Sequence, residues 1–215
     1  MIRRILAFAL LFAARTADAQ SIIGAVADST TDEPLHCVDV AVMDSTNHVL
    51  AWTSTAADGA FRFDSSASGA HHLSFNVWHH VPIVAPLAAS TPADGTPTRY
   101  RLAFELGEKQ KPKYWPDTTD SPPGRPLQWP ADALRYPPEL RKKHIEGGVL
   151  TRYVLDAKGF VDTASIRILQ SDDPAFTTSV DTFLRKVQLT PAHRAGKAVC
   201  ALMLVTPYHF NVQGG

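Results

Sequence analysis

Between residues 20 and 107, hydrophobic residues occur in short runs that polar turns separate. The runs at residues 38–43 and 73–77 alternate apolar and polar positions, as a half-buried strand does. Turn residues return about every ten positions, and no helical period connects the runs. The pattern predicts an all-β sandwich of short strands over residues 20–107.

One turn in this region carries a particularly clear signal. Asp58 and Gly59 lie between the polar run at residues 53–55 and the alternating run at residues 61–63. Because glycine tolerates a positive φ, an Asp-Gly pair is typical of a tight turn between two strands. We expect a β-hairpin that joins these two runs.

A different pattern begins near residue 136. Proline at position 138 fits the first turn of a helix, Glu139 favours the positive end of the helix dipole, and Gly147 indicates the helix end. Asp173 before Pro174 predicts a second helix with an aspartate cap. One apolar stripe at helical spacing follows this cap and consists of Phe176, Val180, Phe183, Leu184 and Val187.

Three strand-like runs accompany the two predicted helices, at residues 149–155, 160–169 and 198–205. The last run is almost wholly apolar but too short to cross a membrane, so it predicts a buried strand. The order helix–strand–strand–helix–strand predicts a C-terminal α+β domain, a three-stranded antiparallel sheet covered by two helices.

Proline is concentrated between the two halves, at residues 108–130. Because proline lacks an N–H group and has a fixed φ, this density predicts a semi-extended linker. Trp115 and Trp129 are unusual in a plain spacer and leave open a contact with one of the domains. We therefore expect a β-sandwich at residues 20–107, a linker at 108–130 and an α+β domain at 131–215.

The first 19 residues have the three parts of a secretory signal peptide. Arg3 and Arg4 give a basic start, residues 5–14 are apolar, and Ala17 to Ala19 offer a small-residue cleavage site. The apolar stretch is far shorter than the ~20 residues that span a bilayer. We expect export to the periplasm; the alternative is a retained membrane anchor.

The chain of 215 residues carries 21 Lys and Arg against 21 Asp and Glu, so it offers no basic surface for nucleic acid. The charges are unevenly distributed. Residues 20–107 hold three basic and nine acidic side chains, whereas residues 136–215 hold ten and seven. This asymmetry fits two separate units whose opposite balances allow electrostatic docking.

The two cysteines, Cys37 and Cys200, lie in different halves of the chain. In an oxidising compartment they are able to form an inter-domain disulfide, provided that their Cα atoms lie roughly 4.4–6.8 Å apart. The alternative is a buried thiol in a strand at each position, since Val38 and Val199 are their neighbours. The sequence favours the buried thiols.

Catalytic and metal-binding motifs are not evident. The sequence lacks G-x-S-x-G, H-E-x-x-H, C-x-x-C and a phosphate-binding glycine loop, so we expect neither an enzyme nor a cofactor. The doublets His71-His72 and His79-His80 are separated by eight positions, roughly 26 Å along a strand, so they predict surface histidines rather than a metal site.

The first half resembles the carboxypeptidase regulatory-like family, which has a transthyretin-like β-sandwich of about seven strands. The residues that carry the resemblance are Gly24, Val26, Asp28, Pro34, Leu35, Val38, Val40, Thr55, Asp58, Gly59, Phe61, Phe63 and Gly69. Modules of that family accompany enzymes and receptors without supplying chemistry, so the resemblance implies no catalytic residue.

The second half resembles the TonB C-terminal domain family over about residues 131–212. The matching positions are Tyr136, Pro137, Glu146, Gly147, Val149, Val154, Asp156, Gly159, Val161, Leu184, Val187, Pro191, Ala192, Gly196, Val199, Pro207 and Phe210. Domains of this family bind a short segment of outer-membrane transporters by adding it as a strand at a sheet edge. The resemblance therefore implies a protein partner in the cell envelope, connected with transmembrane transport.

By analogy with the family, the last strand supplies the peptide-binding edge. Its residues are Val199, Cys200, Ala201, Leu202, Met203, Leu204, Val205 and Thr206. An exposed edge offers unpaired N–H and C=O groups that a partner chain satisfies. Two alternatives stay open: a structural or assembly protein whose TonB-like domain only forms a homodimer, and an anchored energy transducer if the N-terminal segment is not cleaved.

Overall fold

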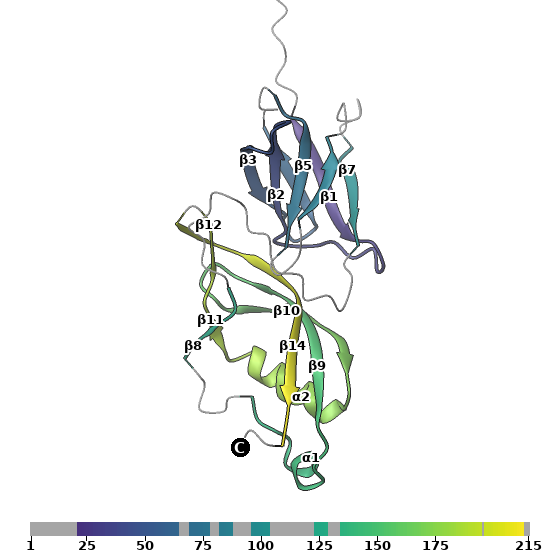
Figure 1. The fold of residues 1–215 in the computed structure, drawn as a ribbon, viewed down its shortest axis with the longest axis vertical. Helices are drawn as coiled ribbons and strands as arrows, with labels where there is room; N and C mark the ends of the chain where they lie inside the picture. The colour runs from purple at the N-terminus through teal and green to yellow at the C-terminus, as the bar shows by residue number, and fades with distance from the viewer. Residues whose placement is uncertain are drawn as a thin grey trace, which may run out of the picture.

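The computed structural model describes residues 21–64, 69–77, 82–87, 96–103, 123–128, 134–194 and 196–212. The predicted signal segment, His79, His80, Trp115 and Trp129 lie outside these residues. Two units are stacked along the long axis of the molecule, with the β-rich N-terminal unit above the C-terminal unit (Figure 1). Over the described residues, no helix is long and apolar enough to cross a membrane.

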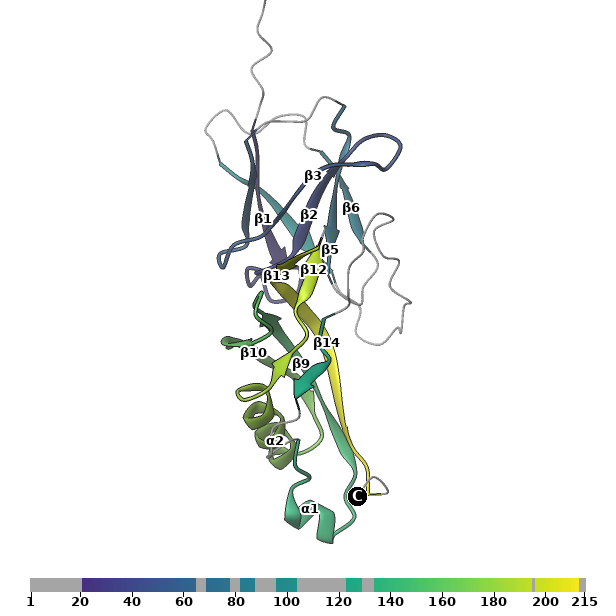
Figure 2. The same ribbon diagram turned by 90° about the vertical axis from the view of Figure 1, so that its left-hand side faces the viewer.

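In the N-terminal domain, the described residues form seven strands in two sheets. One sheet has the order β4-β1-β7 and the other the order β3-β2-β5-β6. The strands are β1 (Ile22–Asp28), β2 (Asp39–Met43), β3 (Val49–Ser54), β4 (Ala60–Phe63), β5 (His72–Asn76), β6 (Ile83–Pro86) and β7 (Thr98–Leu102). The two sheets face each other in Figures 1 and 2.

The core of this domain lies between the two sheets. Val26 and Phe61 from one sheet pack in the same buried cluster as Val40, Leu73 and Phe75 from the other. Each strand therefore contributes alternate side chains to a shared interior, which is the arrangement of a β-sandwich. The predicted all-β sandwich is confirmed.

The predicted hairpin around Asp58 and Gly59 is wrong. Gly59 does adopt a positive φ of 77° in a turn, but β3 pairs with β2 and β4 pairs with β1. The turn thus carries the chain from one sheet to the other. A Cβ at Gly59 would lie 2.3 Å from the carbonyl oxygen of Val26, so this crossing requires glycine.

The C-terminal domain is built on a three-stranded antiparallel sheet of order β10-β9-β14. Its main elements are α1 (Pro138–Lys142), β9 (Gly147–Leu155), β10 (Val161–Ser171), α2 (Pro174–Leu184) and β14 (Ala201–Phe210). Two small ladders accompany this sheet, formed by β8 (Pro126–Gln128) with β11 (Gln188–Leu189) and by β12 (Ala192–Arg194) with β13 (Lys197–Val199). The predicted α+β class is confirmed.

Only α2 covers the sheet, where the sequence predicted two covering helices. Every residue of the predicted apolar stripe is buried between α2 and the sheet, in the same core as Tyr153 and Leu155 of β9. Helix α1 has five residues and lies at the lower end of the domain, where Leu140 enters the same core (Figure 2). The opposite face of the sheet therefore carries no helix among the described elements.

Three boundaries differ from the sequence predictions. Gly147 begins strand β9 rather than ending a helix, because α1 already stops at Lys142. Residues 126–128, assigned to the linker, form a strand that pairs with β11. The apolar run at 198–205 is interrupted at Cys200, so that its first residues pair with β12 and the rest belong to β14.

The role of Asp173 as the N-cap of α2 can be tested by substitution. Its carboxylate accepts a hydrogen bond of 2.7 Å from the backbone N–H of Ala175 at the start of α2. We expect Asp173→Ala to lower the free energy of unfolding by about 1 kcal/mol in urea titrations, whereas Asp173→Asn, which keeps a capping oxygen, loses a few tenths. Equal losses in both variants would contradict the capping role.

Candidate functional site: the outer edge of β14 and the domain junction

Strand β14 is an edge strand of the three-stranded sheet. It pairs with β9 along one side and, among the described strands, has no partner on the other. Such an outer edge presents main-chain N–H and C=O groups to a second chain. The sequence placed the candidate site at residues 199–206; in the structure the N-terminal domain lies against part of that segment, and the open stretch of β14 begins only at its last residue, Thr206.

The first residues of β14 are covered by the N-terminal domain. The N–H of Leu202 donates a hydrogen bond of 3.2 Å to the carbonyl of Cys37. Leu202 and Val154 belong to the buried cluster of the N-terminal domain, while Ala201 and Met203 are buried in the C-terminal core. The main-chain edge near Leu202 is therefore already in use.

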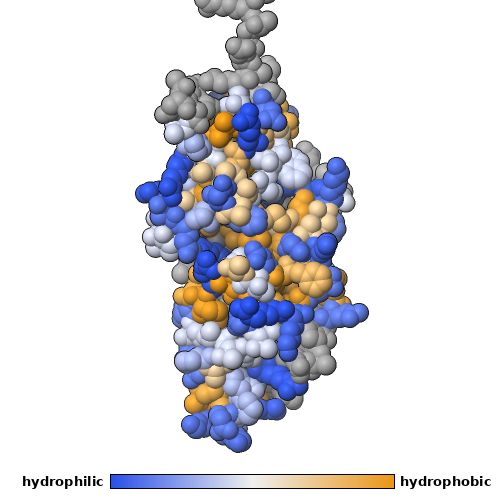
Figure 3. Space-filling model, turned by 180° about the vertical axis from the view of Figure 1, so that it is seen from behind, coloured by the Kyte–Doolittle hydropathy of each residue, from blue (hydrophilic) through white to orange (hydrophobic). Residues whose placement is uncertain are grey.

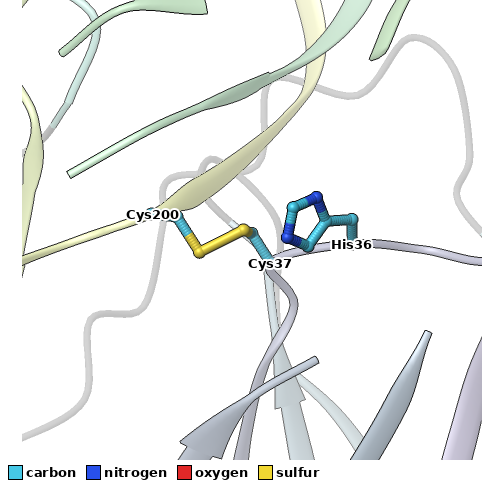
Figure 4. A group of neighbouring side chains, drawn as sticks. All are labelled: His36, Cys37 and Cys200. Carbon is cyan, nitrogen blue, oxygen red and sulfur yellow. A yellow bond between two sulfur atoms is a disulfide. The ribbon is translucent and has the colours of Figure 1, made fainter. Parts of the chain in front are cut away.

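The two cysteines form a disulfide, so the favoured interpretation of two buried thiols was wrong. The Cα atoms of Cys37 and Cys200 lie 5.7 Å apart, and the bond joins the two domains just before β14 (Figure 4). Neither cysteine lies in a strand: Cys37 occupies a turn with a φ of 58°, and Cys200 lies between β13 and β14. Their proximity depends on how the two domains dock, which neither local pattern reveals.

Ion pairs between the domains surround this bond. Arg152 on β9 pairs with Asp28, at 2.9 Å, and with Glu33, and Arg167 on β10 also reaches Glu33. In each pair the arginine belongs to the C-terminal domain and the carboxylate to the N-terminal domain. The charge asymmetry of the two halves indicated this docking, but the sequence could not name the partners.

A further pair is fully enclosed at the junction. Arg194 of β12 pairs with Asp39 of β2, and their side chains are only 6% and 3% exposed. Asp39 also accepts a hydrogen bond of 2.9 Å from the hydroxyl of Ser54, and the Arg194 guanidinium lies 5.1 Å from the ring centre of Trp52. The Asp39 carboxylate and the Trp52 ring thus offset part of the desolvation of this guanidinium, whose Nε is buried without a hydrogen-bond acceptor among the described residues.

The open part of β14 extends from Thr206 to Phe210. Tyr208 and Phe210 point toward α2, so the alternate positions Pro207 and His209 face the uncovered side of the sheet. There they border a hollow of about 340 Å³, to which Gly148, Leu150, Gln170 and Asp172 also contribute. Alternate side chains of an added strand would face this hollow.

Two tyrosines hold the open part of β14 against β9. The hydroxyls of Tyr208 and Tyr153 lie 3.4 Å apart, and burial raises the pKa of both phenols. Both side chains therefore stay neutral over the physiological pH range. The contact joins the open part of β14 to the neighbouring strand β9 on the side that faces α2.

The opposite edge of the sheet is less regular. Strand β10 breaks register with β9 twice, between Asp162 and Arg167 and between Ile168 and Gln170. Such bulges are a common way to keep an edge strand from pairing. β14 also has one irregularity, between Met203 and Thr206, and its Pro207 lacks an N–H group. The stretch of β14 that has no second partner strand among the described residues thus begins at Thr206, whose own carbonyl accepts a hydrogen bond of 3.2 Å from the Thr151 hydroxyl.

The geometry first defines a class of protein: a β-sandwich covalently fixed to a small α+β domain in which, among the described strands, β14 and the irregular β10 are the edges of the sheet. Residues 132–212 match the family model described as Gram-negative bacterial TonB protein C-terminal. The C-terminal domain of this chain belongs to the TonB C-terminal domain family. The search of curated proteins returned no match to the chain.

This family consists of non-enzymatic binding or transducing modules of the cell envelope. For the C-terminal domain, the match therefore supports a part in transport-related protein interactions of the cell envelope. The N-terminal domain is compatible with the predicted carboxypeptidase regulatory-like sandwich, because both are β-rich. That assignment rests on the sequence resemblance.

The enclosed Arg194–Asp39 pair provides a test of the junction. Replacing Arg194 by Met or Asp39 by Asn leaves one partner buried without its counter-charge, so we expect a loss of about 3–5 kcal/mol in the free energy of unfolding. The double variant should lose clearly less than the sum of the two. As a control, Arg62→Met removes the exposed Arg62–Asp64 pair and should cost under about 1 kcal/mol. Additive losses in urea titrations would contradict the proposed coupling.

Proposed function

We propose that this protein is an exported periplasmic binding module without enzymatic activity. It contacts an envelope partner, an outer-membrane transporter in the first instance, by adding a strand from that partner to β14. The observation that carries the proposal is the outer edge of β14 from Thr206 to Phe210, which has no partner strand among the described residues. The TonB family match supports the same role.

Main-chain pairing supplies the affinity in this mode of recognition, and pockets for alternate side chains supply the specificity. The open stretch offers five residues to an added strand. The hollow beside Pro207 and His209 receives the side chains that face the uncovered side of the sheet. Because the N–H of Leu202 already donates a hydrogen bond to the carbonyl of Cys37, the added strand stops short of the domain junction.

The test uses the mature chain, residues 20–215, with its disulfide intact. Peptides from the periplasmic N-termini of outer-membrane receptors of the same organism are titrated into the labelled protein and followed by amide NMR. We expect saturable shifts at the amides of residues 206 and 208–210, since Pro207 has no N–H group, and little change at the Leu202 amide. A peptide with proline at its centre should bind about tenfold more weakly, since it loses a donor and disturbs the pairing.

Other outcomes separate the alternatives. Saturable shifts centred on β10 would move the site to the opposite edge and overturn the proposal. No shifts with any peptide would also overturn it. Sedimentation of the free protein as a dimer, with β14 amides that shift with protein concentration, would favour the structural or assembly role. Membrane-bound protein that retains residues 1–19 would favour an anchored energy transducer.

A further inference from the structure

One group of side chains at the junction has the donor atoms of a metal site. A ring nitrogen of His36 and the sulfurs of Cys37 and Cys200 all lie within 4.8 Å of one another. The His36 ring lies beside the disulfide on the side of Cys37 (Figure 4). Two thiolates and one imidazole form the donor set of a known class of zinc centre, which leaves the fourth position to water.

The backbone explains why two adjacent residues face the same point. In an extended strand, His36 and Cys37 would project to opposite sides. Cys37 instead adopts a φ of 58°, in the left-handed region, and lies in a turn. This conformation lets both side chains approach Cys200 from the other domain.

We propose that in the reduced protein His36, Cys37 and Cys200 form an inter-domain site for Zn²⁺. A dithiol supplies two electrons and two protons: the Cys37–Cys200 bond breaks, each sulfur becomes a thiol, and the dithiol leaves as its own disulfide. Zn²⁺ then displaces one proton from each thiol. His36 donates the lone pair of a ring nitrogen to the ion.

The distances fit this exchange. Zn–S bonds of about 2.3 Å and Zn–N bonds of about 2.0 Å place the donor atoms of a tetrahedral site roughly 3.5–3.8 Å apart. The Cα atoms of the two cysteines are 5.7 Å apart, so rotation about each Cα–Cβ bond brings the sulfurs to that separation once they are reduced. Two thiolates, one neutral imidazole and Zn²⁺ carry no net charge, which keeps the cost of burial low.

Part of the site is accessible to solvent. A groove of about 290 Å³ lies at the domain junction, and His36 and Leu202, but neither cysteine, contribute to its wall. His36 and Cys200 are each partly exposed, whereas Cys37 is buried. Bound Zn²⁺ would keep the two domains linked after the disulfide is lost.

The experiment compares the oxidised and reduced forms of the mature chain. After reduction with a dithiol and its removal under argon, Zn²⁺ is titrated in competition with a colorimetric chelator. We expect one Zn²⁺ per reduced chain and none per oxidised chain. His36→Ala should weaken the affinity by about tenfold or more, since even a supporting contact to a ligand is worth that much. His48→Ala, at an exposed histidine, is the matched control and should bind as the wild type does.

Two further measurements check that the domain junction is still docked in the His36→Ala variant and in the zinc-bound protein. His36→Ala should still form the Cys37–Cys200 disulfide in air, which shows that its junction docks. The N–H of Leu202, which donates a hydrogen bond to the carbonyl of Cys37, should be protected from hydrogen exchange in both the oxidised and the zinc-bound forms. Absence of stoichiometric binding to the reduced chain, equal affinity in His36→Ala, or equal binding to the oxidised chain would each overturn the proposal.

Discussion

The covalent bond between Cys37 and Cys200 fixes the N-terminal domain on the sheet of the C-terminal domain, and much else depends on that placement. Cys200 immediately precedes β14, so the first residues of that strand lie against the N-terminal domain. The hydrogen bond from Leu202 to Cys37 follows directly from it. The same bond makes the separation of the domains independent of the length of the segment between residues 103 and 123.

The ion pairs around the disulfide have a different role. Enclosing Arg194 and Asp39 costs desolvation free energy, which their attraction offsets only when the geometry is good. Such a pair contributes little net stability compared with apolar packing, but it strongly disfavours any other docking that leaves one charge buried alone. The disulfide thus limits how far the domains separate, and the arginine–carboxylate pairs select their orientation.

Two domains held in this way make a short and well-defined binding edge. The β-sandwich occupies the first part of β14, α2 fills the core behind it, and the tyrosine pair steadies the open part. A partner strand therefore meets a preorganised surface and needs little rearrangement of the protein, which reduces the entropic cost of association. A C-terminal domain that moved independently on an extended linker would not present such a preorganised binding surface.

The sequence by itself determined the two domain classes, the Asp173 cap, the stripe beneath α2 and the TonB resemblance, because these depend on local periodicity and on residues close along the chain. It also indicated electrostatic docking through the unequal charges of the two halves. Only the tertiary structure decided that the Asp58-Gly59 turn joins two sheets, that Cys37 meets Cys200, and that the first part of the predicted edge is covered. Each of these features requires segments far apart in sequence to meet; for the disulfide the separation is 163 residues. Such meetings are fixed by how whole domains pack, and the pattern around any one residue does not contain that information.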